Sequence, residues 1–256
     1  MPAYPNRRHF AGWLLAAGAA SLLPFRLAPL RGAGARLTFR PKSAGRIKAE
    51  PGVHPLKLGA DRDGVLYVPR GYQGEKPVPL VLALHGATQS SQMPVRRFTA
   101  AADELGIAFV APDSRLQTWD AIALREFGAD RDFIDRALAA ACERVSVDPR
   151  RVGIAGFSDG ATYALALGRA NGDLFRGVAA FSPGFLIEVE EVGRPPIFIS
   201  HGTSDSILPI EETSRRLVPA LQRGGYKVDY REFDGDHMVP PEMAVAGLRV
   251  AGGVGA

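Results

Sequence analysis

The residues of this sequence with the clearest chemical potential form one short motif, Gly156-Phe157-Ser158-Asp159-Gly160. The apolar segment RVGIAG leads into this G-x-S-x-G pattern, and the helical pattern ATYALALGRA follows it. A serine at such a sharp strand-to-helix turn has a strained backbone and an exposed hydroxyl group. The N-terminus of the following helix also favours negative charge that develops beside the serine. The motif therefore predicts that Ser158 is a nucleophile in acyl transfer.

A serine nucleophile needs a histidine as general base and a carboxylate that orients this histidine. In a strand-turn-helix setting the three residues follow the chain order serine, acid, histidine. His201 and His237 are the two histidines that follow Ser158. His201 ends an apolar segment that is expected to supply the acid, whereas His237 lies on a polar loop beyond the last predicted strand. We therefore predict that His237 is the general base.

Asp205, in the polar loop HGTSDSILP, is the predicted acid. Its carboxylate could accept the Nδ1 proton of His237 and stabilise the imidazolium that forms during attack. Asp234 and Asp236 are too close to His237 in sequence to orient its ring easily, and with one histidine they are too few ligands for a metal site. Three carboxylates after the preceding predicted strand remain open as alternative acids: Glu188, Glu190 and Glu191.

Acyl transfer also needs hydrogen-bond donors for the oxyanion of the tetrahedral intermediate. We expect one donor to be the backbone N–H of Asp159, directly after the serine. The second is expected in the loop LHGATQSS, where Ala87 follows His85 and Gly86. Because His85 precedes the serine in the chain, we expect it to hold this loop by hydrogen bonds.

Apolar segments alternate with helical patterns from residue 64 onward, which is typical of βαβ units around a parallel sheet. The predicted strands are 64–68, 80–84, 107–111, 152–155, 177–181, 197–200 and 227–233. The predicted helices are 95–105, 130–145, 161–170, 211–223 and roughly 241–251. VLALHG, FVAPDS and IFISHG read as strands that are buried on both faces. Ligands bind at the carboxyl ends of such strands, where the candidate residues above lie.

Taken together, LHGATQSS, RVGIAGFSDGATYAL, HGTSDSILP and the GDH loop resemble the α/β-hydrolase superfamily. Within it they are similar to phospholipase/carboxylesterase-type esterases and to the polyhydroxybutyrate depolymerase and feruloyl esterase-like branch. The resemblance covers residues 64–250 and implies a doubly wound, mostly parallel α/β sheet, the triad above and ester hydrolysis without a cofactor. Many depolymerase and feruloyl-type members have cysteines around the oxyanion loop, where this chain has Ala87, so their polymer specificity is not transferred.

One catalytic domain, residues 61–256, accounts for all of these motifs. The 15 residues SPGFLIEVEEVGRPP separate two of its predicted strands where this superfamily often inserts lids, so we expect no cap domain. The site should then be open and shallow, with Trp119 and Phe185 as candidate pocket walls.

Three other functions remain open on the same residues. An acyltransferase would need a closed, dry acceptor pocket, and a serine peptidase would typically need an additional recognition domain. A non-catalytic binding protein would be expected to lack Ser158, His237 or the acid. We therefore expect a carboxylesterase-type serine hydrolase that acts on small-molecule esters through an acyl-enzyme.

Composition and charge exclude further classes. Apolar residues make up 46% of the chain and charged residues 23%, the balance of a folded globular protein. The net charge is +4, but residues 1–35 contain four arginines and no acid, so the remainder is formally neutral. We therefore expect no nucleic-acid partner, because such binding needs a concentrated basic surface. The single cysteine, Cys142, excludes an intramolecular disulfide framework, and we expect it in the core face of a helix.

Residues 1–35 resemble a twin-arginine export signal. Arg7-Arg8 is followed by Phe10 and by an apolar run, residues 11–25. This run is shorter than the roughly 20 residues that a membrane span needs, and its length suits a signal peptide. A buried N-terminal helix is the alternative.

Ala33-Gly34-Ala35 matches an A-x-A cleavage site, so we expect cleavage after Ala35. Residues 36–60 are then an irregular lead-in to the catalytic domain. We expect a periplasmic or secreted mature protein with no stable membrane anchor, and a precursor that engages the twin-arginine machinery.

Replacement of Arg7 and Arg8 together by lysine should retain the precursor in the cytoplasm, because that route reads the arginine pair. Immunoblotting of cell fractions measures the distribution, and unchanged export of the double variant would contradict the twin-arginine interpretation.

Overall fold

The computed structural model describes residues 34–42, 47, 49–59 and 61–255. The arginine pair and the apolar run of the predicted export signal lie outside these residues. None of the helices in the described part is long and apolar enough to cross a membrane.

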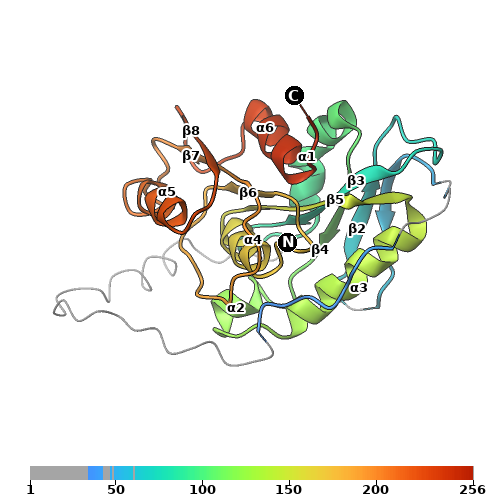
Figure 1. The fold of residues 1–256 in the computed structure, drawn as a ribbon, viewed down its shortest axis with the longest axis horizontal. Helices are drawn as coiled ribbons and strands as arrows, with labels where there is room; N and C mark the ends of the chain where they lie inside the picture. Colours follow the sequence, from blue (N-terminus) through green and yellow to red (C-terminus); the bar gives the residue numbers. More distant parts are fainter. Residues whose placement is uncertain (1–33, 43–46, 48, 60, 256) are drawn as a thin grey trace, which may run out of the picture.

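Eight strands form one sheet in the order β1-β2-β4-β3-β5-β6-β7-β8 (Figure 1). Every neighbouring pair from β4 across to β8 is parallel, and β1 and β2 are antiparallel additions at one edge. The strands are β1 (Gly52–Pro55), β2 (Gly64–Val68), β3 (Val78–Leu84), β4 (Ala108–Pro112), β5 (Val147–Phe157), β6 (Val178–Phe181), β7 (Ile197–Gly202) and β8 (Val228–Phe233). The seven predicted strands correspond to β2 through β8, which confirms the mostly parallel sheet.

Helices cover both faces of this sheet, as a doubly wound fold requires. Helices α1 and α6 lie together on one face, and α3 and α4 lie on the other (Figure 1). The helices are α1 (Gln92–Leu105), α2 (Asp120–Ala123), α3 (Ala129–Arg144), α4 (Asp159–Ala170), α5 (Ser214–Arg223) and α6 (Pro241–Ala251). The segment between β6 and β7, residues 182–196, contains neither helix nor strand, so no cap domain is inserted there.

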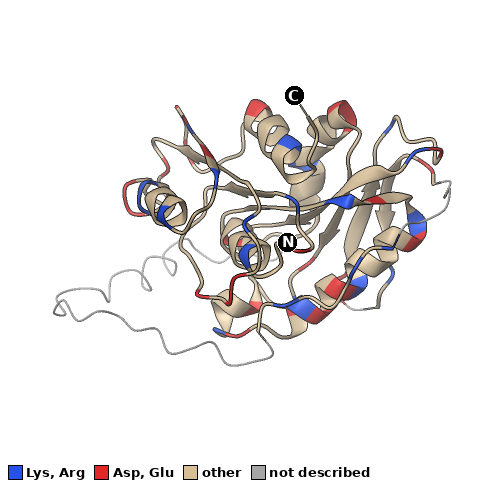
Figure 2. Cartoon of the chain, in the orientation of Figure 1, with Lys and Arg blue, Asp and Glu red and all other residues tan. Residues whose placement is uncertain are grey.

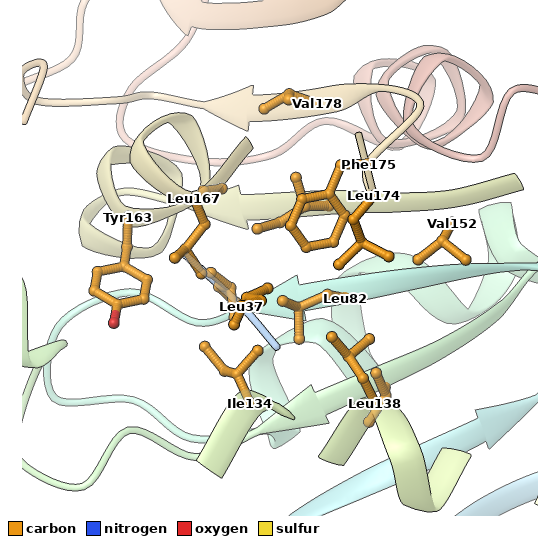
Figure 3. Close-up of a cluster of buried hydrophobic side chains, with 14 of the residues drawn as sticks. Leu37, Leu82, Ile134, Leu138, Val152, Tyr163, Leu167, Leu174, Phe175 and Val178 are labelled. Carbon is orange, nitrogen blue, oxygen red and sulfur yellow. The ribbon is translucent and has the colours of Figure 1, made fainter. Parts of the chain in front are cut away.

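The central strand β3 shows how the sheet is buried on both faces. Leu82 packs on the same side as Ile134 and Leu138 of α3 (Figure 3). Its neighbours Val81 and Ala83 point to the other side and join the cluster of α1 and α6. Because successive side chains of a strand alternate between faces, a strand between two helical layers must be apolar throughout.

Part of the predicted irregular lead-in, residues 36–60, forms strand β1, which corrects that interpretation. Strand β1 pairs with β2, but it is an edge strand whose alternate residues face solvent, so it lacks an apolar run. Residues 34–42, here called the N-terminal strap, are docked on the domain: the side-chain amide of Asn171 accepts a hydrogen bond from Leu37 N (2.8 Å) and donates one to the carbonyl of Ala35 (2.8 Å). The predicted cleavage position after Ala35 therefore lies in a docked segment.

Acidic and basic residues are interspersed along α3 (Figure 2). Arg131 pairs with Asp132 on this helix, and at the other end of the molecule Arg215 of α5 pairs with Glu232 of β8. Exposed pairs of this kind contribute little stability each, about 0–1 kcal/mol. The fold is held instead by the two apolar clusters on either side of the sheet.

Candidate active site

Ser158, His237 and Asp205 are joined in one chain of hydrogen bonds. The Ser158 hydroxyl donates to His237 Nε2 at 2.9 Å, and His237 Nδ1 donates to Asp205 Oδ2 at 2.7 Å. The direction of both bonds follows from the carboxylate, which can only accept, so Nδ1 of the neutral ring carries the proton. The structure thus brings together three predicted residues that are 79 and 32 positions apart in the chain.

Backbone sterics place the serine. Ser158 has φ 57° and ψ −120°, a strained conformation between β5 and α4, and its N–H donates to the carbonyl of Phe181 (2.9 Å). The helix that follows is packed tightly against β3: a Cβ at Gly160 would lie 2.5 Å from the carbonyl oxygens of Leu84 and His85. The last glycine of the motif is therefore required by a close approach of two backbones.

The general-base candidate is held by packing as well as by hydrogen bonds. The ring of His237 lies 4.6 Å from the ring of Phe157, the second residue of the G-x-S-x-G motif. Asp236 accepts hydrogen bonds from both the N–H and the hydroxyl of Ser206, at 2.8 and 2.9 Å, which ties the His237 loop to the Asp205 loop. Asp236 is thus a clamp between the two loops and does not orient the histidine ring.

Asp205 lies in the loop after β7, and its side chain is fully buried. Its Oδ1 accepts hydrogen bonds from the N–H groups of Ile207 (3.0 Å) and Leu208 (2.8 Å). Burial raises the pKa of this carboxyl, but the hydrogen bonds from Leu208 and from His237 outweigh burial and hold the pKa below its ordinary value. The carboxylate is therefore ionised at neutral pH. Glu191, one of the alternative acids, is instead paired with Arg169.

The two predicted oxyanion donors border the serine. A Cβ at Gly86, next to Ala87, would lie 3.3 Å from Ser158 Cβ, which places the loop after β3 beside the nucleophile. Within the described residues, neither Ala87 N–H nor Asp159 N–H has a hydrogen-bond acceptor. Both donors are therefore available to an oxygen of a ligand at Ser158.

His85 holds the oxyanion loop, as expected. Its Nδ1 donates to the carbonyl of Gly86 at 2.7 Å, and its Nε2 accepts from Ser114 N at 2.9 Å. Burial lowers the pKa of His85, so the ring is neutral and this tautomer is fixed by its two partners. The prediction of a structural histidine is confirmed.

Trp119 is not a pocket wall, which corrects the prediction. Its side chain is fully buried, its indole N–H donates to the carbonyl of His85 (2.9 Å), and its ring stacks on Tyr163 at 5.2 Å. The loop after β4 folds inward, so the indole supports the oxyanion loop from inside the core. Phe185, by contrast, is 47% exposed, and its role as a pocket wall stays a prediction.

A buried pair of carboxylates, which sequence reasoning missed, fixes the same loop. Asp120 and Asp130 each accept the backbone N–H of the other, at 2.7 and 2.9 Å, and Asp120 also accepts from the Tyr163 hydroxyl (2.8 Å). Burial raises the pKa of Asp130 to about 6. On this loop, the Thr118 hydroxyl donates to the side chain of Asp159 at 2.5 Å. This bond connects the loop that the Asp120–Asp130 pair fixes to the turn at Ser158.

Several large exposed apolar side chains lie on loops that also carry residues of the site. Ile207 and Met238 lie within two positions of Asp205 and His237 in the chain, Leu116 lies in the loop that leads to Trp119, and Phe185 lies in the loop after β6. Covering such side chains with a ligand favours binding by roughly 25 cal/mol per Å² of apolar surface removed from water.

The described part of the chain has no group of three or more potential metal ligands. Cys142 lies in α3, where burial raises its pKa to about 11.

The chain belongs to the phospholipase/carboxylesterase family, whose pattern it matches over residues 112–246. This family is part of the α/β-hydrolase superfamily, in agreement with the sheet order and the turn at Ser158.

Individual relatives are esterases by name. The putative esterase NocK of Nocardia uniformis subsp. tsuyamanensis is 32% identical over 155 residues, 56% of this chain and 45% of that protein. The probable feruloyl esterase C of Aspergillus oryzae is 31% identical over 171 residues, 62% of this chain and 60% of that protein. The chain thus spans about half the length of the curated relatives it matches.

Solved structures share the fold at lower identity. A ferulic acid esterase from Anaeromyces mucronatus, solved with ferulic acid, has a TM-score of 0.60 and 20% identity, and the match covers 81% of this chain and 94% of that one. The fluorophosphonate-binding serine hydrolase FphF of Staphylococcus aureus has a TM-score of 0.61 and 14% identity, over 79% and 98% of the two chains. At these identities the likeness extends to the fold alone.

Replacement of His85 by glutamine should alter how stability depends on pH. Because the pKa of His85 is lowered in the folded state, the unfolded chain binds more protons below its ordinary value of 6.5, and the folded protein loses stability there. The difference in melting temperature between wild type and His85→Gln should shrink between about pH 7 and about pH 5. Thermal unfolding followed by circular dichroism measures it, and a difference that stays constant would contradict the neutral buried ring.

Proposed function

We propose that this protein hydrolyses small-molecule carboxylic esters as a serine hydrolase of the carboxylesterase type. The observation that carries the proposal is the continuous hydrogen-bonded chain from Ser158 through His237 to the buried Asp205, in a member of the phospholipase/carboxylesterase family. No other group of residues in the described part combines a strained serine, a general base and an ionised acid in this way.

In the first half of the reaction, Ser158 Oγ attacks the carbonyl carbon of the ester while its proton moves to His237 Nε2. The imidazolium that forms is stabilised by the Asp205 carboxylate at 2.7 Å from Nδ1. His237 then donates the same proton to the leaving alkoxide, the C–O bond of the ester breaks, and an acyl group remains on Ser158. The short serine–histidine distance of 2.9 Å allows this transfer without a large movement.

The negative charge of the tetrahedral intermediate falls on the former carbonyl oxygen. Ala87 N–H and Asp159 N–H are the proposed donors to this oxygen, and the N-terminus of α4 adds a favourable field. Both donors are backbone groups on rigid supports, one held by His85 and one at the start of a buried helix. They need little reorganisation when the charge develops.

In the second half, a water molecule takes the place of the departed alcohol and attacks the acyl carbon. His237 accepts a proton from this water as the water oxygen bonds to the acyl carbon, which gives a second tetrahedral intermediate. The bond between the acyl carbon and Ser158 Oγ then breaks, His237 returns the proton to Oγ, and the carboxylic acid leaves. Water as acceptor is supported by the absence of a cap between β6 and β7, which leaves this side of the described site uncovered. An acyltransferase would be expected to keep water out.

The exposed apolar side chains favour esters with an apolar acyl or alcohol part. Phe185, Ile207 and Met238 are 47%, 62% and 38% exposed and lie on the loops that surround the proposed nucleophile. A p-nitrophenyl ester series of increasing acyl length would identify the preferred substrate.

We also propose export by the twin-arginine route and a periplasmic or secreted mature protein. The arginine pair Arg7-Arg8 supports this proposal, and the fractionation experiment above tests it.

Substitutions in the triad should act as one unit. Ser158→Ala and His237→Ala should each lower ester hydrolysis by several orders of magnitude, and the double variant should be hardly worse, because neither residue works without the other. Asp205→Asn should cost about 10⁴ in kcat, since an amide cannot stabilise the imidazolium and can favour the wrong tautomer. Glu188→Gln is the matched control for the acid. Near-normal kcat in Asp205→Asn, together with a severe loss in Glu188→Gln, would show that another carboxylate is the acid.

The backbone N–H of Ala87, and not its side chain, should matter for kcat. Ala87→Ser keeps the N–H and should retain much of the activity, whereas Ala87→Pro removes this donor and should lower kcat by about 10²–10³. Steady-state kinetics on folded variants, checked by circular dichroism, make the comparison. Full activity in a folded proline variant would remove Ala87 from the site.

A further inference from the structure

Asp205 contacts a second histidine besides His237. His201 Nε2 lies 3.1 Å from Asp205 Oδ2, the same oxygen that accepts His237 Nδ1 at 2.7 Å. His201 is the penultimate residue of β7, and its side chain and that of Asp205 are both fully buried. Polar contacts are stronger in such surroundings than in water, because the effective dielectric constant is low. The reaction steps above assign no role to this ring.

The protonation of His201 follows from its neighbours. Nε2 faces two acceptors, the carbonyl of Leu208 at 2.8 Å and the Asp205 carboxylate at 3.1 Å, so this nitrogen must carry a proton. Nδ1 lies 2.7 Å from the hydroxyl of Ser214, which can donate to it. Burial lowers the pKa of His201, and the ring is therefore neutral with its single proton on Nε2.

Leu208 connects the two contacts of His201. Its carbonyl accepts the Nε2–H of His201, and its own N–H donates to Asp205 Oδ1 at 2.8 Å. His201 thus hydrogen-bonds the turn whose N–H binds Asp205 Oδ1, and its Nε2 lies 3.1 Å from the other carboxylate oxygen. Loss of the Nε2–H would remove both the contact with Asp205 Oδ2 and the hydrogen bond to the Leu208 turn, so the carboxylate could rotate more easily.

We propose that His201 is a positioning residue for ester hydrolysis: its Nε2–H fixes the Asp205 carboxylate in the orientation that accepts Nδ1–H of His237. The inference rests on the proposed function, because the orientation of Asp205 matters to the reaction only if His237 acts on Ser158. His201 acts through Asp205 and not on the substrate. Its loss should therefore lower kcat and leave KM nearly unchanged.

Two amide substitutions test the position of the proton donor. In His201→Gln the amide nitrogen can reach the place of Nε2, whereas in His201→Asn it reaches only the place of Nδ1. Both bury the same polar group, so they are matched in chemistry. The glutamine variant should retain most of the activity, and the asparagine variant should lose about 10–100-fold in kcat. Losses of this size are typical when a group that orients a metal-binding side chain is removed, and His201 orients Asp205 in a similar way.

A double-variant cycle separates positioning from general damage. In an Asp205→Asn background, His201→Asn should cause little further loss, because there is no longer a carboxylate to position. Three results would each overturn the proposal. They are a decrease in kcat by the same factor in both backgrounds, equal activity of the glutamine and asparagine variants, and a change confined to KM. If neither amide variant folds, Ser214→Ala is the second test. It removes the hydrogen bond that holds the Nδ1 side of the ring, so the ring can turn and Nε2–H loses its direction toward Asp205. This variant should lower kcat, and an unchanged kcat would overturn the proposal.

Ser158→Ala, measured beside these variants, distinguishes the two possible failures. Full hydrolysis by Ser158→Ala would contradict the proposed function and the role of His201 with it. Abolished hydrolysis by Ser158→Ala, together with equal glutamine and asparagine variants at position 201, would overturn the positioning role alone.

Discussion

A carboxylate without solvent contact is the constraint on which the rest of the site depends. The Asp205 side chain is fully buried, and an uncompensated charge there would cost on the order of several kcal/mol. Two backbone N–H groups satisfy one of its oxygens, and the rings of His237 and His201 lie at the other. Because the carboxylate can only accept, it draws the proton of His237 to Nδ1 and leaves Nε2 free to accept from Ser158.

The serine itself is positioned by backbone packing instead of by charge. The strained φ of 57° at Ser158 is maintained because α4 is pressed against the carboxyl end of β3, where only a glycine at position 160 fits. The same end of β3 continues into the loop of Ala87, so one close approach sets both the nucleophile and the oxyanion donors. The buried Asp120–Asp130 pair and Trp119 then hold this loop from inside the core.

Local patterns were enough to predict the parts of the site that depend on chain order. The G-x-S-x-G motif between a strand and a helix predicted the turn at Ser158, and the loops after the last two strands predicted where the acid and the base come from. The apolar runs predicted the buried strands, since a strand covered on both faces cannot alternate.

The features that sequence reasoning missed depend on contacts between distant segments. Strand β1 has no apolar run because it lies at the edge, and the burial of Trp119 depends on how the loop after β4 folds back onto Tyr163. From the sequence, His201 is a candidate only for the general base. Its position in HGTSD, four residues before the acid, was a usable signal, but the turn that brings its ring back to Asp205 Oδ2 is visible only in three dimensions.

The most direct test of the account is the stoichiometry and position of covalent modification by an organophosphonate ester, measured by mass spectrometry of the intact protein and of its peptides. A serine activated by the His237–Asp205 pair displaces the leaving group of this reagent, and we expect one phosphonyl group per chain, on the peptide that contains Ser158. A folded protein that stays unmodified, or one that carries the group on a different residue, would contradict the assignment of Ser158 as the nucleophile.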